Sequence, residues 1–203
     1  RIEGRAAHSS LVHQGCNAIE YAAQLICYLR SLADQVKKEG PFDECFDVPF
    51  TSFSTNMIHG GTAPNIIPAA CECIFEFRNL PQMQASEINK KINHYIEHEL
   101  LPKIKREYAD AKIELDNIAV APSFESIENS DVVTSVRKFT QSNQKHKVAY
   151  ATEAGLFQAA GIPSIVCGPG SIEQAHRPNE YVEVSQLQKC EEFLRSISIN
   201  EFS

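Results

Sequence analysis

Apolar residues recur at two different spacings along the first 118 residues, and these spacings predict alternating strands and helices. Where apolar side chains recur every three or four positions, as in Asn17–Lys38, the pattern predicts a helix with one buried face. Where apolar and polar residues alternate, as in Cys71–Leu80, it predicts a strand covered on one face. The predicted elements are a strand at 1–8, a helix at Asn17–Lys38, strands at Thr51–His59 and Cys71–Leu80, a helix at Ala85–Tyr108 with Ser86 as N-cap, and a strand at Lys112–Ile118. This order is that of a ferredoxin-like βαββαβ domain.

Residues 119–203 show a different pattern, in which helices alternate with short strands. The predicted elements are helices at Asp131–Gln141, Ala154–Ala160 and Ser185–Ile197 and strands at Val148–Ala151 and Ser164–Cys167. Such alternation is typical of a layered α/β sheet, but two strands are too few for a stable sheet of this kind. We therefore expect an α/β protein in two parts. An α+β domain at 1–118 is followed, at 119–203, by part of a layered α/β domain whose other strands lie elsewhere.

The composition is that of a folded globular protein that binds neither nucleic acid nor membranes. Of the 203 residues, 43% are hydrophobic and 22% are charged, and no apolar run reaches the length needed to cross a bilayer. The net charge of −7 argues against nucleic-acid phosphates as partners, because these need clustered Lys and Arg. The seven cysteines lie mostly within apolar patterns, which predicts reduced thiols in a cytoplasmic protein. Cys71 and Cys73 alternate along a strand, and no second pair completes a zinc site.

The stretch from Cys167 to Glu180, CGPGSIEQAHRPNE, combines two glycines with a histidine after a predicted strand. Open α/β sheets bind ligands at the carboxyl ends of strands, and Gly168 and Gly170 let the backbone approach a bound group. The imidazole of His176 can bind a divalent metal, with Glu180 available as a supporting carboxylate. One histidine does not make a metal site, so an ordinary loop with an incidental histidine is the alternative on spacing alone.

Three further side chains lie in segments suited to binding polar groups. His8, in GRAAHSS, can donate a hydrogen bond to a developing oxyanion, or it is a partly exposed turn histidine. Asn65, in GGTAPNIIP, can present an amide donor, or it belongs to a plain turn. Arg78, near the end of an apolar strand, suits a substrate carboxylate, or it pairs with Glu76 or Glu72.

His94 and His98 match the H-x-x-E-H pattern of inverted zinc proteases and share one helical face. The predicted helix is highly charged at this point, with Lys90, Lys91 and Glu99 nearby, and it has no evident third ligand. A solvated helix face therefore explains the pair without a metal.

Four segments, GRAAHSS, GGTAPNIIP, FRNLP and TEAGLFQAAGIPSIVCGPGSIEQAHRPNEY, together resemble the acetylornithine deacetylase branch of the zinc-dependent aminoacylase/carboxypeptidase family. The resemblance extends over essentially the whole chain, and GPGSIEQAHRPNEY is highly specific. The same family includes succinyl-diaminopimelate desuccinylase, aminoacylase and several peptidases. The resemblance implies a catalytic domain with two metal ions, Zn²⁺ or Co²⁺, interrupted by a lid domain that dimerises. Residues 1–118 then match the lid, and 119–203 match the C-terminal part of the catalytic domain.

The resemblance also implies roles for the two histidines. His176 falls on the family's late metal-binding histidine. His8 falls on the lid histidine that reaches a neighbouring subunit's site to stabilise the tetrahedral intermediate. The chain lacks the His-x-Asp pair, the bridging Asp and the Glu-Glu pair of the family's early metal site. We therefore expect a fragment that lacks the N-terminal half of the metal site and is inactive by itself.

Substrate contacts are implied in the same way. Asn65 and Arg78 fall on lid positions associated with substrate, and Gly168 and Gly170 on a loop that lines the pocket. Glu153, in the motif TEA, is expected either to bind the ornithine ammonium or to cap the helix that follows it.

The implied reaction of the parent enzyme is the deacetylation of N2-acetylornithine to ornithine and acetate in arginine biosynthesis. The expected substrate is thus a small N-acetylated amino acid, and the expected assembly is a cytoplasmic homodimer formed through the lid. A related aminoacylase, desuccinylase or dipeptidase is one alternative. A non-catalytic dimerisation module is the other.

Overall fold

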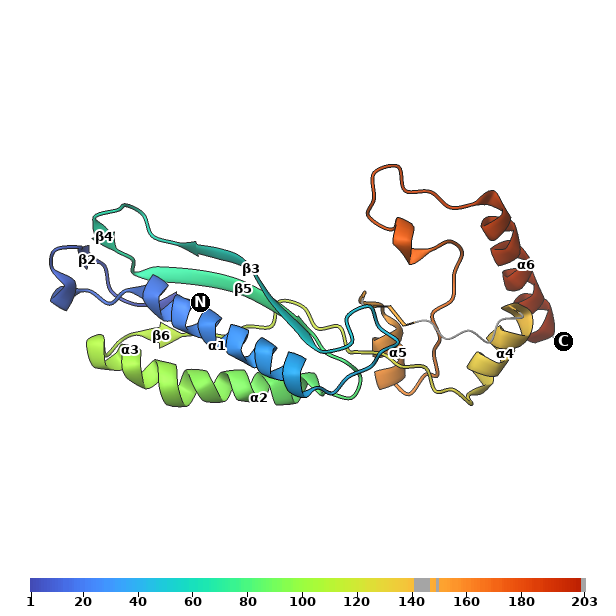
Figure 1. Ribbon diagram of the computed structural model, residues 1–203, viewed down its shortest axis with the longest axis horizontal. Helices are drawn as coiled ribbons and strands as arrows, with labels where there is room; N and C mark the ends of the chain where they lie inside the picture. The colour runs from blue at the N-terminus through green and yellow to red at the C-terminus, as the bar shows by residue number, and fades with distance from the viewer. Residues whose placement is uncertain (141–146, 149, 202–203) are drawn as a thin grey trace. The chain divides into compact units, whose positions relative to one another are not determined.

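The computed structural model describes residues 1–140, 147–148 and 150–201, with side chains as far as residue 198. The chain divides into two compact units, Arg1–Val120 and Ala121–Ser203 (Figure 1). This division falls two residues after the predicted boundary at residue 118. The assignment of the two units as a lid and as part of a catalytic domain remains a prediction.

The first unit contains a four-stranded antiparallel sheet. Its strands are β1 (Ile2–Glu3), β3 (Ser52–Gly60), β5 (Ala70–Arg78) and β6 (Lys112–Ile113), in the spatial order β3-β5-β1-β6. All three neighbouring pairs are antiparallel. This is the strand order of a ferredoxin-like domain, so the mixed α/β fold class predicted from the sequence is confirmed. The last strand is shorter than predicted, because only Lys112 and Ile113 pair with β1.

Two long helical segments pack side by side on this sheet (Figure 1). The first, α1 (Ala18–Glu39), begins where the Asn17 side-chain oxygen accepts hydrogen bonds from the backbone N–H groups of Ile19 and Glu20. It ends at Gly40, whose φ of 79° favours glycine. The second segment consists of α2 (Ala85–Tyr95), a π-helical turn η2 (Ile96–Leu100) and α3 (Leu101–Glu107).

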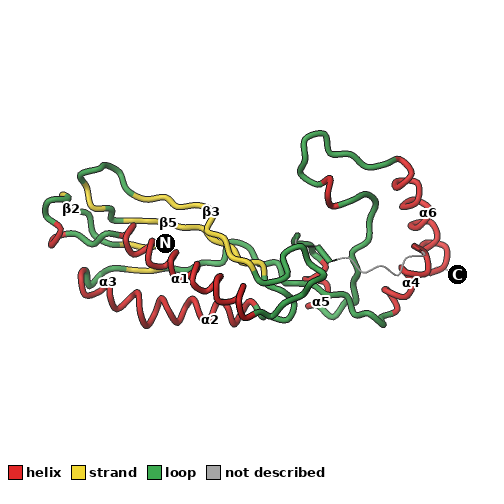
Figure 2. The backbone as a smooth tube through the Cα atoms, in the orientation of Figure 1, coloured by secondary structure: helices red, strands yellow, loops and turns green. Residues whose placement is uncertain are grey.

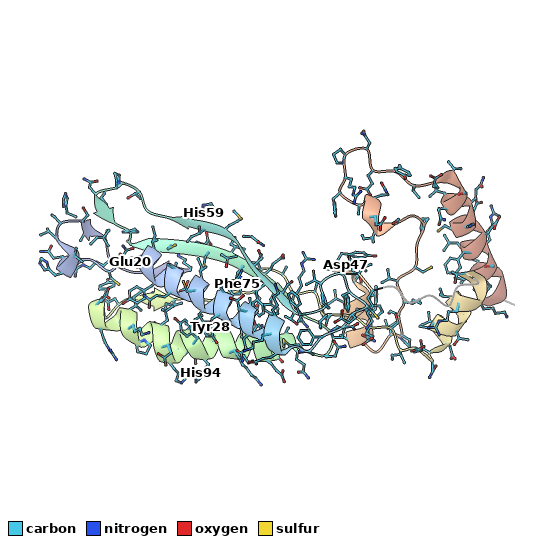
Figure 3. The ribbon with its side chains drawn as sticks, viewed as in Figure 1. Glu20, Tyr28, Asp47, His59, Phe75 and His94 are labelled. Carbon is cyan, nitrogen blue, oxygen red and sulfur yellow. The ribbon has the colours of Figure 1, made fainter. Side chains whose placement is uncertain are left out.

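The core of the first unit lies between these helices and the sheet. Its members are apolar, or nearly so, and are each at most 5% exposed: Ile2, Cys16, Ala18, Tyr21, Ala22, Leu25, Leu29, Leu32, Val36, Cys71, Ile88, Ile92, Ile96, Leu100, Ile104 and Ala111. On the helices these residues recur every three or four positions, which is the apolar stripe of the sequence. Tyr28 of α1 and Tyr95 of α2 stack with ring centroids 3.9 Å apart beside this core; Figure 3 labels Tyr28 on α1.

The π-helical turn interrupts what the sequence predicted as one continuous helix. Leu101 donates its backbone N–H to the carbonyl of Ile96, five residues earlier. The next residue, Pro102, has no N–H to donate and its ring would clash with the carbonyl four residues before it, so a wider turn is formed. Ser86 is not the N-cap that was predicted. Gln84 holds that position without a side-chain capping bond, and Ser86 donates its hydroxyl to Gln84 Oε1 at 3.4 Å.

The second unit is built from helices and long connections (Figure 2). Its helices are α4 (Asp131–Thr140), α5 (Ala154–Ala159), the short η3 (Ile172–Gln174) and α6 (Val184–Glu201). Phe139 of α4 and Phe193 of α6 meet edge to face with centroids 6.2 Å apart. Gly155, in α5, lies against the Pro122 carbonyl, where a Cβ atom would come within 2.3 Å of the oxygen.

The two strands predicted in this unit are not formed within the described residues. Ser164–Cys167 makes no β-ladder, and neither do the described positions of 148–151. Two predicted positions lie outside the described residues: Ala149 in the first strand and Gln141 at the end of the predicted helix. A strand needs a neighbour to accept and donate its backbone hydrogen bonds. Two short apolar runs without further strands cannot satisfy that need. Among the helices described, none combines the length and apolar character required to span a bilayer.

Leu100 offers a direct test of the core. Its side chain is fully buried, and we expect Leu100→Ala to lower the free energy of unfolding by about 2–5 kcal/mol through lost apolar contacts and the cavity that remains. Glu99→Ala, on the exposed neighbour, is expected to change it by no more than about 0.5 kcal/mol. Urea unfolding monitored by circular dichroism measures both values. Equal effects of the two substitutions would contradict this core assignment.

Candidate functional site

Two candidate residues of the first unit, His8 and Asn65, are brought together by a small two-stranded ribbon. Strand β2 (Ala7–His8) pairs antiparallel with β4 (Ile66–Ile67), with Ala7 opposite Ile67 and His8 opposite Ile66. Ser9 donates its backbone N–H to the Asn65 carbonyl at 2.9 Å. Figure 1 shows this β2–β4 ribbon at one end of the unit. The motifs GRAAHSS and GGTAPNIIP, far apart in the sequence, therefore form one structural feature.

The His8 side chain is exposed, and its ring is held by the turn that follows β2. Its Nδ1 accepts the backbone N–H of Ser10 at 3.2 Å, and the Ser10 hydroxyl oxygen lies 2.7 Å from the same nitrogen. The turn is closed by the Leu11 N–H, which donates to the His8 carbonyl at 2.8 Å. No described residue bonds to Nε2. His8 is thus a partly exposed turn histidine, as one prediction held, and its role as a donor to an oxyanion remains a prediction.

Asn65 likewise presents an exposed side chain from a fixed backbone. The loop before it turns at Gly61, whose φ is 83°, and at Ala63, whose carbonyl accepts the Ile66 N–H at 3.2 Å. Within the described residues, the Asn65 amide has no hydrogen-bond partner. Its donor and acceptor are therefore free to contact a ligand.

Arg78 lies at the opposite end of the same sheet. It is the last residue of β5 and pairs with Ser52, whereas Cys71, near the other end of β5, pairs with Gly60 close to the β2–β4 ribbon. Arg78 lies seven positions after Cys71 along an extended strand, which is a distance of about 23 Å. Arg78 Nε lies 3.4 Å from Glu76 Oε1, so the ion pair proposed as its alternative is formed. Both side chains are about half exposed, and such a pair stabilises the fold only slightly.

The glycine loop of the second unit carries two residues in an unusual backbone conformation. His176 and Asn179 both have a φ of 60°, a region that residues other than glycine rarely adopt. Gly170 has a φ of 92°, which favours glycine, whereas Gly168 has open space around it. The predicted supporting carboxylate, Glu180, accepts the backbone N–H of His176 at 3.0 Å. It therefore holds the main chain of His176, and the imidazole remains exposed.

Glu153 directly precedes α5 but does not cap it through its side chain. Thr152 takes that role, because its hydroxyl oxygen accepts the Ala154 N–H at 3.2 Å. Glu153 nevertheless holds the N-cap position of α5 through its backbone carbonyl, as the capping alternative placed it, without a side-chain bond. Its carboxylate is exposed, which leaves the ammonium-binding prediction open.

The described residues contain no group of three or more His, Cys, Asp or Glu side chains that could hold a metal ion. A tetrahedral zinc site needs three or four such ligands, so His176 alone does not fit one. His94 and His98 do not fit either. Their rings stack with centroids 4.3 Å apart and 24° between planes, and His98 Nδ1 lies 3.1 Å from the backbone carbonyl oxygen of His94. Figure 3 labels His94 on α2.

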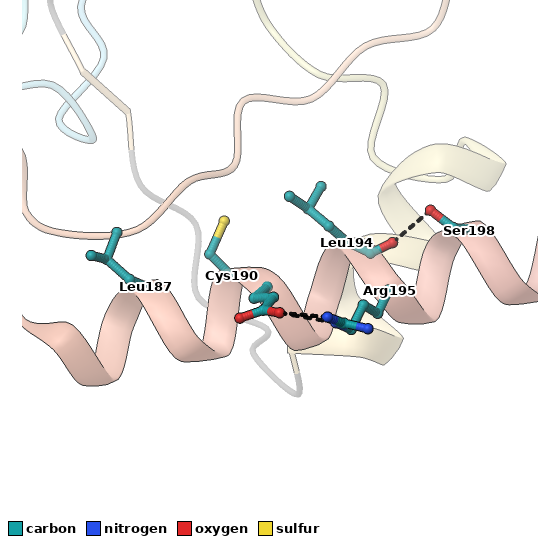
Figure 4. A pocket seen from close by; sticks show the side chains of 6 residues that line it. Leu187, Cys190, Leu194, Arg195 and Ser198 are labelled. Carbon is teal, nitrogen blue, oxygen red and sulfur yellow. Dashed lines mark hydrogen bonds and ion pairs between the residues drawn. The ribbon is translucent and has the colours of Figure 1, made fainter.

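An open hollow on α6 contains none of the predicted residues. It is lined by Leu187, Cys190, Leu194 and neighbouring polar side chains from the same helix (Figure 4). Arg195 is paired with Glu191 at 2.8 Å. The hollow is an exposed helix face with no convergent polar groups.

Residues 1–103, half of the chain, match the family model described as the peptidase dimerisation domain of M20 peptidases. The chain belongs to this M20 dimerisation family. Solved structures agree with the assignment at the level of the fold. A tripeptidase from Staphylococcus aureus subsp. aureus Mu50 matches with a TM-score of 0.65 and 23% identity over 95% of this chain and 48% of its own.

Two further structures show the same fold. The aminopeptidase PepT from Bacillus cereus ATCC 10987 matches with a TM-score of 0.60 and 20% identity, over 95% of this chain and 48% of its own. An aminobenzoyl-glutamate utilization protein from Klebsiella pneumoniae matches with a TM-score of 0.55 and 18% identity, over 98% and 46%. The chain thus spans about half the length of these proteins. Membership of the M20 dimerisation family confirms the prediction at the level of the family, over residues 1–103.

The β2–β4 ribbon is anchored to the core through Cys16, and this anchor is testable. Cys16 exchanges backbone hydrogen bonds with Arg5, and its buried thiol has its pKa raised to about 11 by burial, by the negative charge of Glu107 and by a hydrogen bond to it. In the unfolded chain this thiol ionises near 9.0. We therefore expect the free energy of unfolding to fall between about pH 9 and 11, by more in wild type than in Cys16→Ala.

Thiol labelling provides the control for this prediction. At pH 8 the exposed Cys27 and Cys45 are expected to react with iodoacetamide while Cys16 does not. Rapid labelling of Cys16 in the folded chain, or an identical pH dependence in Cys16→Ala, would show that the thiol is not held in the core.

Proposed function

We propose that this chain supplies the dimerisation domain and the C-terminal part of the catalytic domain of a metal-dependent amidohydrolase. The proposed reaction is the deacetylation of N2-acetylornithine to ornithine and acetate, in arginine biosynthesis and in the cytoplasm. The observation that carries the proposal is the placement of His8 and Asn65 at one end of the sheet and Arg78 at the other, within an M20 dimerisation domain.

The separation of these residues suits a homodimer in which each dimerisation domain serves two catalytic sites. Groups at opposite ends of a strand about 23 Å long cannot both contact one small N-acetylated amino acid. In the proposed arrangement, His8 and Asn65 reach the partner's site, where their N–H groups donate to the amide oxygen as it gains negative charge. Arg78 serves the other site and binds the substrate carboxylate in place of Glu76.

The exposed edge of the sheet offers a surface for this dimer. Among the strands of the described residues, β3 pairs with β5 alone, so its outer backbone groups are available to bond to a second copy. Its residues from Ser54 to Gly60 are exposed, and they include Met57 and Ile58, each about half exposed. The opposite edge strand, β6, has only two residues and offers much less pairing.

In the proposed enzyme His176 contributes one imidazole to a site for Zn²⁺ or Co²⁺, and the other ligands come from outside the described residues. When bound, the metal supplies a Lewis acid and an activated water. Glu153, exposed before α5, binds the ornithine ammonium. By itself the 203-residue chain is then expected to bind Zn²⁺ weakly and to hydrolyse nothing.

Two other functions are favoured by specific observations. An aminoacylase or peptidase would use the same His8, Asn65 and Arg78, and the similar solved structures include a tripeptidase and an aminopeptidase. A non-catalytic dimerisation module would account for the lack of a metal-ligand group among the described residues. Turnover of acetylornithine, acetylmethionine and dipeptides by the intact enzyme separates the first alternative from the proposal.

The proposed substrate makes a prediction at Glu153. In the intact enzyme, Glu153→Gln is expected to lower kcat/KM for acetylornithine about 10- to 100-fold, because a charge-assisted hydrogen bond is lost. The value for acetylmethionine, which has no ammonium group, is expected to stay the same. The control is Glu183→Gln, on another exposed glutamate. Steady-state kinetics measure kcat/KM for both substrates. Equal wild-type rates on acetylornithine and acetylmethionine would contradict the ornithine assignment.

A further inference from the structure

Ser10 places a backbone N–H and a hydroxyl group against one nitrogen of the His8 ring. Its backbone N–H lies 3.2 Å from Nδ1, and its hydroxyl oxygen lies 2.7 Å from the same atom. A backbone N–H can only donate, so Nδ1 must present a lone pair to it. The hydroxyl can rotate to donate to the same lone pair.

These contacts select one tautomer of the neutral imidazole. If Nδ1 carried the proton, its N–H would point at the Ser10 N–H, and two donors would face each other. The remaining arrangement has the lone pair on Nδ1 and the proton on Nε2. Since Nε2 has no partner in the described part of the chain and the side chain is exposed, its N–H is available to a ligand.

The contact is held by backbone bonds on both sides. The Leu11 N–H closes the turn onto the His8 carbonyl at 2.8 Å, which places Ser10 at the third position of a four-residue turn. The Ser9 N–H bonds to the Asn65 carbonyl at 2.9 Å, and His8 lies opposite Ile66 in the ribbon. A side-chain acceptor bonded to the N–H two residues later is the arrangement of Asx and Ser/Thr turns, here made by a histidine.

We propose that Ser10 is a positioning residue that holds His8 in the tautomer protonated at Nε2, with this N–H directed outward as a ready donor. The catalytic importance of this tautomer rests on the proposed function, in which His8 donates to the developing oxyanion. The assignment of the tautomer does not rest on the proposed function, because it follows from contacts within the ribbon alone.

The test is nuclear magnetic resonance of the 203-residue chain with ¹⁵N-labelled histidine, at a pH where His8 is neutral. Long-range ¹H–¹⁵N correlations identify which ring nitrogen carries the proton. Wild type is expected to show the form protonated at Nε2. Ser10→Ala removes the hydroxyl donor but keeps the backbone N–H. It is expected to raise the population of the form protonated at Nδ1 about two- to tenfold, the range for one ordinary hydrogen bond.

Two controls separate positioning from a structural effect. Ser10→Thr keeps a hydroxyl and is expected to restore the wild-type populations, whereas Ser9→Ala, on the adjacent serine, is expected to leave them unchanged. The amide signals of Ile66 and Ile67 report whether the ribbon remains paired in each variant. A wild-type ring protonated at Nδ1, or equal populations in wild type and Ser10→Ala with the ribbon intact, would overturn the proposal. Evidence that His8 has no catalytic role would refute the proposed function, but it would not affect the assignment of the tautomer.

Discussion

The antiparallel pairing of Ala7–His8 with Ile66–Ile67 determines where the polar chemistry of the first unit lies. Without this ribbon, His8 and Asn65 would belong to two unrelated loops. The pairing depends in turn on β1, which lies between β5 and β6 and brings the following residues to the start of β5. Gly4 permits this course, because a Cβ atom there would lie 2.2 Å from the Cys16 carbonyl oxygen. The candidate site is therefore a consequence of the sheet's register.

The same register places Arg78 at the far end of β5, and this has a functional consequence. In a monomer, donors at opposite ends of a strand cannot act on one small substrate. A symmetric dimer removes the difficulty, because each copy then contributes one end of its sheet to each of two sites. Membership of the M20 dimerisation family and the exposed edge of β3 both support that arrangement.

Much of the first unit could be predicted from the sequence, because helical and strand spacings are local properties. The stripe that includes Leu29 and Leu32 predicted α1 to within one residue at each end. The π-helical turn was missed, although Pro102 was visible inside the helical pattern and signalled an interruption. The strand at Ser164–Cys167 was predicted from its apolar run alone. A strand depends on neighbours, and the described part of the second unit provides none.

The candidate site could be predicted only in part. The motifs identified His8 and Asn65 separately, but their placement in one ribbon depends on pairing between distant segments, which no local spacing shows. The role of Ser10 was also missed, although the serine two residues after His8 was a usable sign. Glu153 holds the predicted N-cap position of α5, but the side-chain bond to the first turn comes from Thr152, because either neighbour can reach that turn and only the backbone geometry decides between them. His176 is exposed, and its role as a metal ligand remains a prediction.

Sharing of catalytic sites between subunits is the central claim, and mixed dimers of the intact enzyme test it most directly. His8→Ala removes the proposed oxyanion donor and His176→Ala removes the proposed metal ligand, so each variant alone is expected to be nearly inactive. When the two variants are co-expressed, a mixed dimer contains one site with an intact His176 and a His8 donated by the partner. About half of the dimers are mixed and each has one working site, so activity is expected to recover to about a quarter of wild type. Mixed dimers without activity would show that His8 serves its own subunit, and the account would be wrong.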